Sequence, residues 1–225
     1  MYISDLIIIA AKKFGDYDED GADDAAKYTR MKIADWVDAY NAAQKQLVAV
    51  RPDANYKHAT WQLTANEARH ALPADCVQLI SVDRNMGSAG ATPGAAIRPL
   101  KKSVLDGLLL SWHSDTGVTA VEFYAYDIRQ PKTLFTYQRT HASTAVWVEG
   151  AYSYHFTEAA LASITTTAVA AGAEFHNALI AWMLKEAFDI DVDTQGGFVK
   201  AQKQEQSFYN MLGVEFSSSK QIAPQ

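Results

Sequence analysis

The sequence predicts an α+β protein, in which N- and C-terminal helices form one bundle with an inserted antiparallel β lobe and an extended C-terminal tail. Apolar residues recur at spacings of three and four near both ends of the chain, which is the period of one helix face. Between them, short runs rich in β-branched and aromatic residues are separated by links too short to hold helices. The simplest packing assigns residues 1–58 and 171–213 to the helical bundle, 59–170 to the β lobe and 214–225 to the tail.

The overall composition limits the class of protein. A chain of 225 residues, with 48% hydrophobic and 20% charged residues, is long enough for a full core and is not wholly disordered. The formal net charge of -6 argues against a protein that reads nucleic-acid sequence, although a mildly acidic wall lets DNA pass without adhesion. Cys76 is the only cysteine, so an internal disulfide and a cysteine-rich zinc site are excluded.

The first helix is expected over residues 2–14, where apolar side chains share one face. Ser4 or Asp5 is placed to cap its start, and Gly15 ends it. The apolar run at residues 6–11 is far shorter than the ~20 residues that span a bilayer. It also lacks the basic start and the cleavage site of a secretory signal, so neither membrane insertion nor export is predicted.

Residues 16–24 form a dense acidic loop. Asp16, Asp18 and Asp20 alternate before a glycine, as in the first half of a calcium-binding EF-hand loop. The twelfth position of such a loop needs a bidentate glutamate, and this sequence has Lys27 there. We therefore predict a solvated linker, with binding of a divalent ion as the alternative.

The longest amphipathic segment runs from Thr29, the predicted N-cap, to Pro52, which lacks an amide hydrogen and closes the helix. Trp36 and Tyr40 stand one turn apart and give its apolar face two large anchors. We expect this face to hold the bundle together, with Trp182 of a later helix as a third anchor.

The middle of the chain holds the predicted β lobe. Residues 53–69 are polar and irregular, and residues 86–94 are small and glycine-rich, so both are predicted as loops. A short helix is expected over residues 102–112. The strands of an expected antiparallel meander are residues 77–83, 118–126, 134–138 and 144–154.

Two further helices follow a connection rich in alanine and threonine at residues 156–171. They are expected over residues 173–190 and 198–212, and Gly213 stops the second one. The tail holds three apolar residues with nothing local to bury them against. These are Val214, Phe216 and Ile222.

Motifs for catalysis or cofactor binding are absent from the sequence. It has no GxSxG elbow, no P-loop and no GxGxxG motif that opens a helix. His113 and Asp115 offer two metal ligands without a third at a recognisable spacing, so a turn is the preferred interpretation. His176 and Cys76 are interpreted as buried structural residues. We predict no enzyme, no cofactor and no metal, and a hydrolase that uses His113 and Asp115 is the weakest hypothesis.

The predicted β lobe is rich in aromatic residues, which raises a second possible function. A carbohydrate-binding tail or receptor module would need such rings exposed side by side. Alternating strands bury about half of their side chains, so a core or a protein interface is the preferred interpretation. The rings are Trp112, Tyr124, Tyr126, Tyr137, Trp147 and Tyr152.

Four segments, in order, resemble those of one family of phage proteins. Residues 36–54 are similar to a helix of this family that carries an Asn-Ala pair and is followed by Arg-Pro-Asp-Ala. Residues 72–85 are similar to a strand of the family that begins with Leu-Pro and ends in Arg-Asn. Residues 98–113 resemble a family segment that is first basic, then leucine-rich, and ends in Trp-His. Residues 121–138 resemble a family hairpin that contains Tyr-x-x-Asp, a proline and a tyrosine. In this series the chain resembles the head-to-tail adaptors of tailed bacteriophages, also called connectors or head-completion proteins.

The likeness covers roughly residues 1–213, with two departures. The family pattern has a proline pair after the tyrosine of the hairpin, whereas Gln138 and Arg139 follow Tyr137 here, which bears on the shape of this β edge. Residues 161–171 also match poorly.

The resemblance implies a structural virion protein. Such adaptors form a ring of about twelve copies below the portal, continue the DNA channel and present a platform for the tail nozzle. The implied partners are further copies of the chain, the portal protein, the nozzle or tail tube protein, and passing double-stranded DNA without sequence reading. The implied location is the virion neck, after assembly in the host cytoplasm. In related adaptors the C-terminal tail reaches onto the portal, which assigns this contact to Val214, Phe216 and Ile222.

Overall fold

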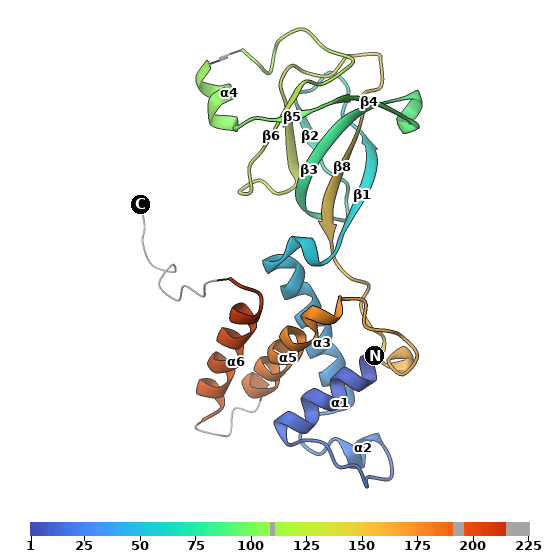
Figure 1. Ribbon diagram of the computed structural model, residues 1–225, viewed down its shortest axis with the longest axis vertical. Helices are drawn as coiled ribbons and strands as arrows, with labels where there is room; N and C mark the ends of the chain where they lie inside the picture. The colour runs from blue at the N-terminus through green and yellow to red at the C-terminus, as the bar shows by residue number, and fades with distance from the viewer. Residues whose placement is uncertain (109–110, 191–195, 215–225) are drawn as a thin grey trace. The chain divides into compact units, whose positions relative to one another are not determined.

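The computed structural model describes residues 1–108, 111–190 and 196–214 (Figure 1). It contains helices and two β-sheets, which confirms the predicted α+β class. Its contacts divide the chain into two compact units. The helical unit consists of Met1–Ala54 and the described residues from Phe156 onward, and the β unit is Asn55–His155.

The boundaries of these units differ from the predicted ones at 58/59 and 170/171. The first strand already begins at Tyr56. Residues 156–170 belong to the helical unit because Ile164 is buried in its core and Ala168 forms a β-bridge with Tyr2. A single buried isoleucine in an Ala/Thr-rich connection has no periodicity that would reveal this packing from sequence.

Within the helical unit, α5 packs between α6 on one side and α1 and α3 on the other (Figure 1). The helices expected near the two ends of the chain are all present, each within a few residues of the predicted bounds. The α-helices are α1 Ile3–Phe14, α2 Asp24–Lys27, α3 Ile33–Val50, α5 His176–Ile190 and α6 Gly197–Met211. The short 3₁₀ turns are η1 Pro52–Ala54, η3 Leu161–Ser163 and η4 Ala173–Phe175.

One apolar core holds these helices together, with contributions from α1, α3, α5 and α6. Complete burial of a large apolar side chain contributes about 1.5–3 kcal/mol relative to exposure, so this core is the main source of the unit's stability. The largest side chains that are fully buried in it are Leu6, Ile7, Trp36, Tyr40, Leu47, Leu179, Met183 and Phe208.

The start of α1 is held by both local and distant acceptors. The Asp5 carboxylate accepts a hydrogen bond from the Tyr2 amide at 2.8 Å, as expected for a residue in the first turn. The amides of Ile3 and Ser4 donate to carbonyl groups of the 156–170 connection. Gly15 ends the helix in the left-handed conformation with φ 79°, which confirms the predicted stop.

Helix α3 begins three residues later than predicted. Thr29 is not its cap; the Asp35 carboxylate instead accepts from the Lys32 amide at 3.0 Å, and the first helical residue is Ile33. The end is as predicted: Arg51, which precedes Pro52, has left the helical conformation with φ -126° and ψ 83°.

The β unit contains two four-stranded sheets with the orders β1-β8-β3-β4 and β2-β7-β6-β5. The predicted antiparallel meander is wrong, because its strands are divided between the two sheets: β3 pairs with β8 in one sheet, and β6 with β7 in the other. In addition, β1 and β8 come from opposite ends of the unit and pair side by side, and β5 pairs with β6 in parallel. The strands are β1 Tyr56–Gln62, β2 Arg69–Ala71, β3 Cys76–Gly87, β4 Thr92–Ala96, β5 Arg98–Pro99, β6 Phe123–Tyr126, β7 Thr133–Thr136 and β8 Trp147–Tyr154.

Two of the predicted loops are parts of the first sheet. β1 lies in the stretch predicted to be irregular, and β3 continues through η2 (Ser88–Gly90) into β4 where a glycine-rich loop is predicted. β1 and β4 are the two edge strands of this sheet, and all five residues of β4 are exposed. An edge strand with few buried side chains lacks the alternation that marks a strand in sequence. Helix α4 is Lys102–Leu108, within the predicted range of 102–112.

Candidate interaction surfaces

The three aromatic residues assigned as anchors lie in the core of the helical unit. Trp36 and Tyr40 are fully buried, and Trp182 is 9% exposed. The ring of Trp36 meets Phe14 edge-to-face with centroids 5.8 Å apart, and Trp182 meets Phe208 at 4.9 Å. Burial raises the pKa of Tyr40 to about 12. These side chains position the helices and are not part of a surface.

Asp16 is fully buried, which corrects its assignment to a solvated linker. Its carboxylate accepts hydrogen bonds from the amide of Met31 at 3.1 Å and from the indole N–H of Trp36 at 3.2 Å. It also accepts from the Arg30 amide and, at 3.3 Å, from the Thr29 hydroxyl. Thr29 is therefore a donor to Asp16 rather than the cap of α3. All of these partners are donors of the chain itself, so the carboxylate acts as a structural hub between α1 and α3.

The residues considered for catalysis or metal binding have different local surroundings. His113 is exposed and Asp115 half-buried in a turn, as predicted, whereas the His176 imidazole lies at the start of α5, with Nε2 3.2 Å from the Ala171 carbonyl. Cys76 is buried, and desolvation raises the pKa of its thiol to about 11. Within residues 1–108, 111–190 and 196–214, no group of three or more His, Cys, Asp or Glu side chains is placed to hold a metal ion.

The aromatic residues of the β unit do not form an exposed platform. All of them except Trp147 belong to the apolar cores of the unit or pack against these cores, which agrees with the preferred interpretation of a core or interface. Trp112, Tyr124 and Tyr152 are buried, and Tyr126, Tyr137 and Trp147 are half-buried.

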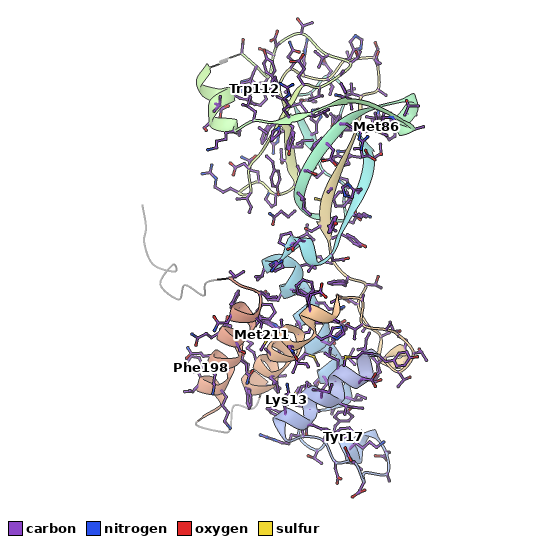
Figure 2. The ribbon with its side chains drawn as sticks, viewed as in Figure 1. Lys13, Tyr17, Met86, Trp112, Phe198 and Met211 are labelled. Atoms are coloured by element: carbon purple, nitrogen blue, oxygen red, sulfur yellow. The ribbon has the colours of Figure 1, made fainter. Side chains whose placement is uncertain are left out.

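The helical unit has a groove of about 370 Å³ on its surface, lined by five apolar and three polar residues. Its lining residues come from α1, α5 and α6, and those of α5 follow one stripe of that helix. Lys13 on α1 and Met211 on α6, both labelled in Figure 2, lie at its rim and are exposed. The lining residues are Lys13, Asn177, Ile180, Ala181, Leu184, Phe188, Gln204 and Met211.

Helix α6 also presents large apolar side chains to solvent near its start. Phe198 is 71% exposed and Val199 65% exposed, and Figure 2 shows Phe198 on the outer side of the helix. Only Gly197, Ala201 and Phe208 of this helix are buried, and Phe208 packs against Trp182 of α5. These two adjacent residues are the most exposed large apolar side chains of this helix. We refer to Phe198 and Val199 as the knob.

The β unit carries a second apolar hollow, of about 410 Å³. Ile80 at its edge is 45% exposed. The hydroxyl of Tyr126 donates to the Pro131 carbonyl at 3.3 Å, so the polar end of this ring is already used within the fold. The hollow is lined by Leu79, Ile80, Pro99, Leu100, Lys101, Tyr124 and Tyr126.

Comparison with known proteins identifies the family of the chain. The family model described as SU10 adaptor protein matches residues 1–223. The chain belongs to this family. The SU10 adaptor proteins are phage head-to-tail adaptors, so the resemblance seen in the sequence is confirmed. None of the curated proteins that were compared matches the chain.

Membership in the SU10 adaptor family gives the chain a structural role in a phage virion, with portal and tail proteins as partners and the neck as its place. No helix in the described ranges is long and apolar enough to cross a membrane.

The hairpin departs from the family pattern at a special backbone position. Gln138 has φ 60°, in the left-handed region, and proline is restricted to φ near -65°. The chain therefore takes a path here that a proline at this position does not allow.

The tail residues are only partly within the described structure. Val214 is half-buried against the helical core, and its amide donates to the Tyr209 carbonyl at 3.0 Å. It therefore has local packing, contrary to the prediction. Phe216 and Ile222 lie outside the described residues.

Proposed function

We propose that the protein is a ring-forming head-to-tail adaptor that docks below the portal of a tailed phage, continues the DNA channel and presents a platform for the tail nozzle. The family match over residues 1–223 carries this proposal. The ring is a cyclic homo-oligomer, of about twelve copies, in which each copy contacts its neighbours through two different surfaces. It assembles in the host cytoplasm.

The charge of the chain suits a conduit for DNA. The net charge is -6, and a mildly acidic wall repels the phosphate backbone, so double-stranded DNA passes without being held. The exposed knob and the apolar hollow of the β unit suit a protein whose surfaces become covered in an assembly.

The C-terminal tail is the proposed portal contact, through Phe216 and Ile222. The test compares the full chain with a variant that ends at Val214, which keeps the contact of this residue with the helical core. A matched control retains residues 215–225 and replaces Phe216 and Ile222 with serine, so that chain length is unchanged. Binding to purified portal-bearing heads is measured by co-sedimentation, and the particles are viewed by electron microscopy.

The full chain is expected to add a ring of density below the portal, whereas both variants fold but remain in the supernatant. If both variants still join the heads, the role of the tail is wrong. If the full chain does not bind and is absent from the neck of virions, the adaptor function is wrong.

A further inference from the structure

Residues 137–146 join β7 to β8 and so connect the two sheets of the β unit. This connection is tied to two distant parts of the unit by backbone hydrogen bonds. The Thr140 amide donates to the Glu67 carbonyl at 2.8 Å, and the His141 amide donates to the Val118 carbonyl at 2.8 Å. The middle of the connection is therefore held in place, and the residues that follow it depend on a side chain.

The imidazole of His141 closes the second half of the connection. Its Nδ1 atom accepts hydrogen bonds from the backbone amides of Ser143 at 3.2 Å and Thr144 at 3.1 Å. The Ser143 hydroxyl lies 3.4 Å from the same nitrogen. A ring nitrogen accepts only through its lone pair, so Nδ1 carries no hydrogen and Nε2 carries the one of the neutral ring. We refer to residues 141–144, which are held in this way, as the latch.

Proton uptake by the ring removes the acceptor that holds the latch. An imidazolium carries a hydrogen on both nitrogens and accepts at neither, so the two amides would face an N–H group of a cationic ring. Histidine is the side chain that ordinarily changes its charge between pH 5 and 8. The atom of His141 that holds the turn is the same atom that takes up the proton, so the two events exclude each other.

The surroundings of His141 give the charged ring no new partner. Its contacts with other segments are made by backbone atoms: the Asn66 amide donates to its carbonyl at 3.4 Å, and a side chain at Gly117 would meet its Cα atom at 3.2 Å. Among the described residues, no carboxylate is paired with the imidazole. The charged residues nearest to these contacts along the chain are Glu67, Asp115 and Arg139.

A second histidine supports the first half of the connection and keeps its charge state over the same pH range. The Thr136 hydroxyl donates to the Gln138 carbonyl at 2.9 Å, so its oxygen accepts from His70 Nε2 at 3.0 Å. This relay supports the turn in which Gln138 has φ 60°. His70 is 1% exposed, and burial lowers its pKa to about 4. The first half therefore stays fixed at a pH that acts on His141.

We propose that residues 141–144 form a proton-operated latch of the β unit, which the neutral His141 ring closes and which opens when Nδ1 takes up a proton. Only two residues separate the latch from β8, which pairs with both β1 and β3. Its opening therefore loosens the first residues of this central strand. The change is local and reversible, because the backbone bonds of Thr140 remain. The proposal goes beyond the adaptor function and does not depend on it.

NMR of the full chain tests the latch through amide hydrogen exchange and the nitrogen signals of the histidine rings. His141→Asn is the decisive variant, because its side-chain oxygen can accept from the amides that follow, as in an Asx turn, and does not titrate. His141→Ala removes the acceptor at every pH. His155→Asn, which replaces an exposed histidine of the same unit, is the matched control. Protection of each amide is calculated against its intrinsic exchange rate at the same pH.

In the wild-type chain, the protection of the Ser143 and Thr144 amides is expected to fall about 10-fold between pH 7.5 and pH 5, in step with proton uptake by the His141 ring. His141→Asn should keep the protection at both pH values, and His141→Ala should lack it at both. The control should follow the wild type. The amides of Thr136 and Thr140 should stay protected, which separates opening of the latch from unfolding of the unit.

Unchanged protection of Ser143 and Thr144 while the His141 ring takes up its proton would overturn the proposal. A ring that stays neutral down to pH 4.5 would do the same, because the latch would then have no trigger. Opening of His141→Asn with the pH dependence of the wild type would assign the change to another group. The wild type and His141→Asn decide the test even where His141→Ala does not fold. None of these results bears on the adaptor function, which is tested by binding to portal-bearing heads.

Discussion

Replacing Asp16 with alanine removes the acceptor that joins α1 to the start of α3. Two of its donors, the Met31 amide and the Trp36 indole, are buried, and their hydrogen bonds measure 3.1 and 3.2 Å. A hydrogen bond to a charged acceptor contributes about 1.5–3 kcal/mol, and a buried donor left without a partner carries a similar cost. The Arg30 and Thr29 donors are part-buried and are satisfied by water after the change.

We therefore expect Asp16→Ala to lower the free energy of unfolding of the helical unit by about 3–5 kcal/mol. The assay is urea unfolding followed by tryptophan fluorescence, to which Trp36 contributes because its indole lies against Asp16. With a slope of about 2 kcal/mol per molar urea, the midpoint should fall by roughly 1.5–2.5 M. Asp20→Ala, an exposed aspartate of the same loop, is the matched control and should shift the midpoint little. A loss below about 1 kcal/mol for Asp16→Ala would refute the hub.

Three further predictions concern the β unit. Cys76 should resist thiol reagents at pH 8 until the chain is unfolded, since burial raises its pKa to about 11; rapid labelling of the native protein would contradict this. Burial lowers the pKa of His70 to about 4, so the unfolded chain takes up a proton below pH 6.5 that the folded chain does not bind. The unit should therefore lose about 2 kcal/mol between pH 7 and pH 5 in urea titrations, and His70→Phe should abolish that part of the pH dependence. Gln138→Gly should raise the free energy of unfolding by up to about 1 kcal/mol because φ is 60°. Gln138→Pro should lower it strongly, and equal effects of the two changes in urea titrations would show that the turn is not strained.

The parts of the fold that follow from local chemistry could be predicted from the sequence. Gly15 and Pro52 end their helices because one adopts the left-handed conformation readily and the other lacks an amide hydrogen. The apolar faces of α3 and α5 predict burial of their aromatic residues, since a wide apolar stripe requires a core.

The parts that depend on distant partners could not be predicted in this way. Asp16 has the same local sequence context as an exposed aspartate, and only the return of the chain at Met31 makes it an acceptor in the core. Strand β1 has one buried side chain, Trp61, so its pairing with β8 is set by a neighbour about 90 residues away rather than by its own pattern. The groove is likewise formed by three helices, and no single segment of sequence carries its shape.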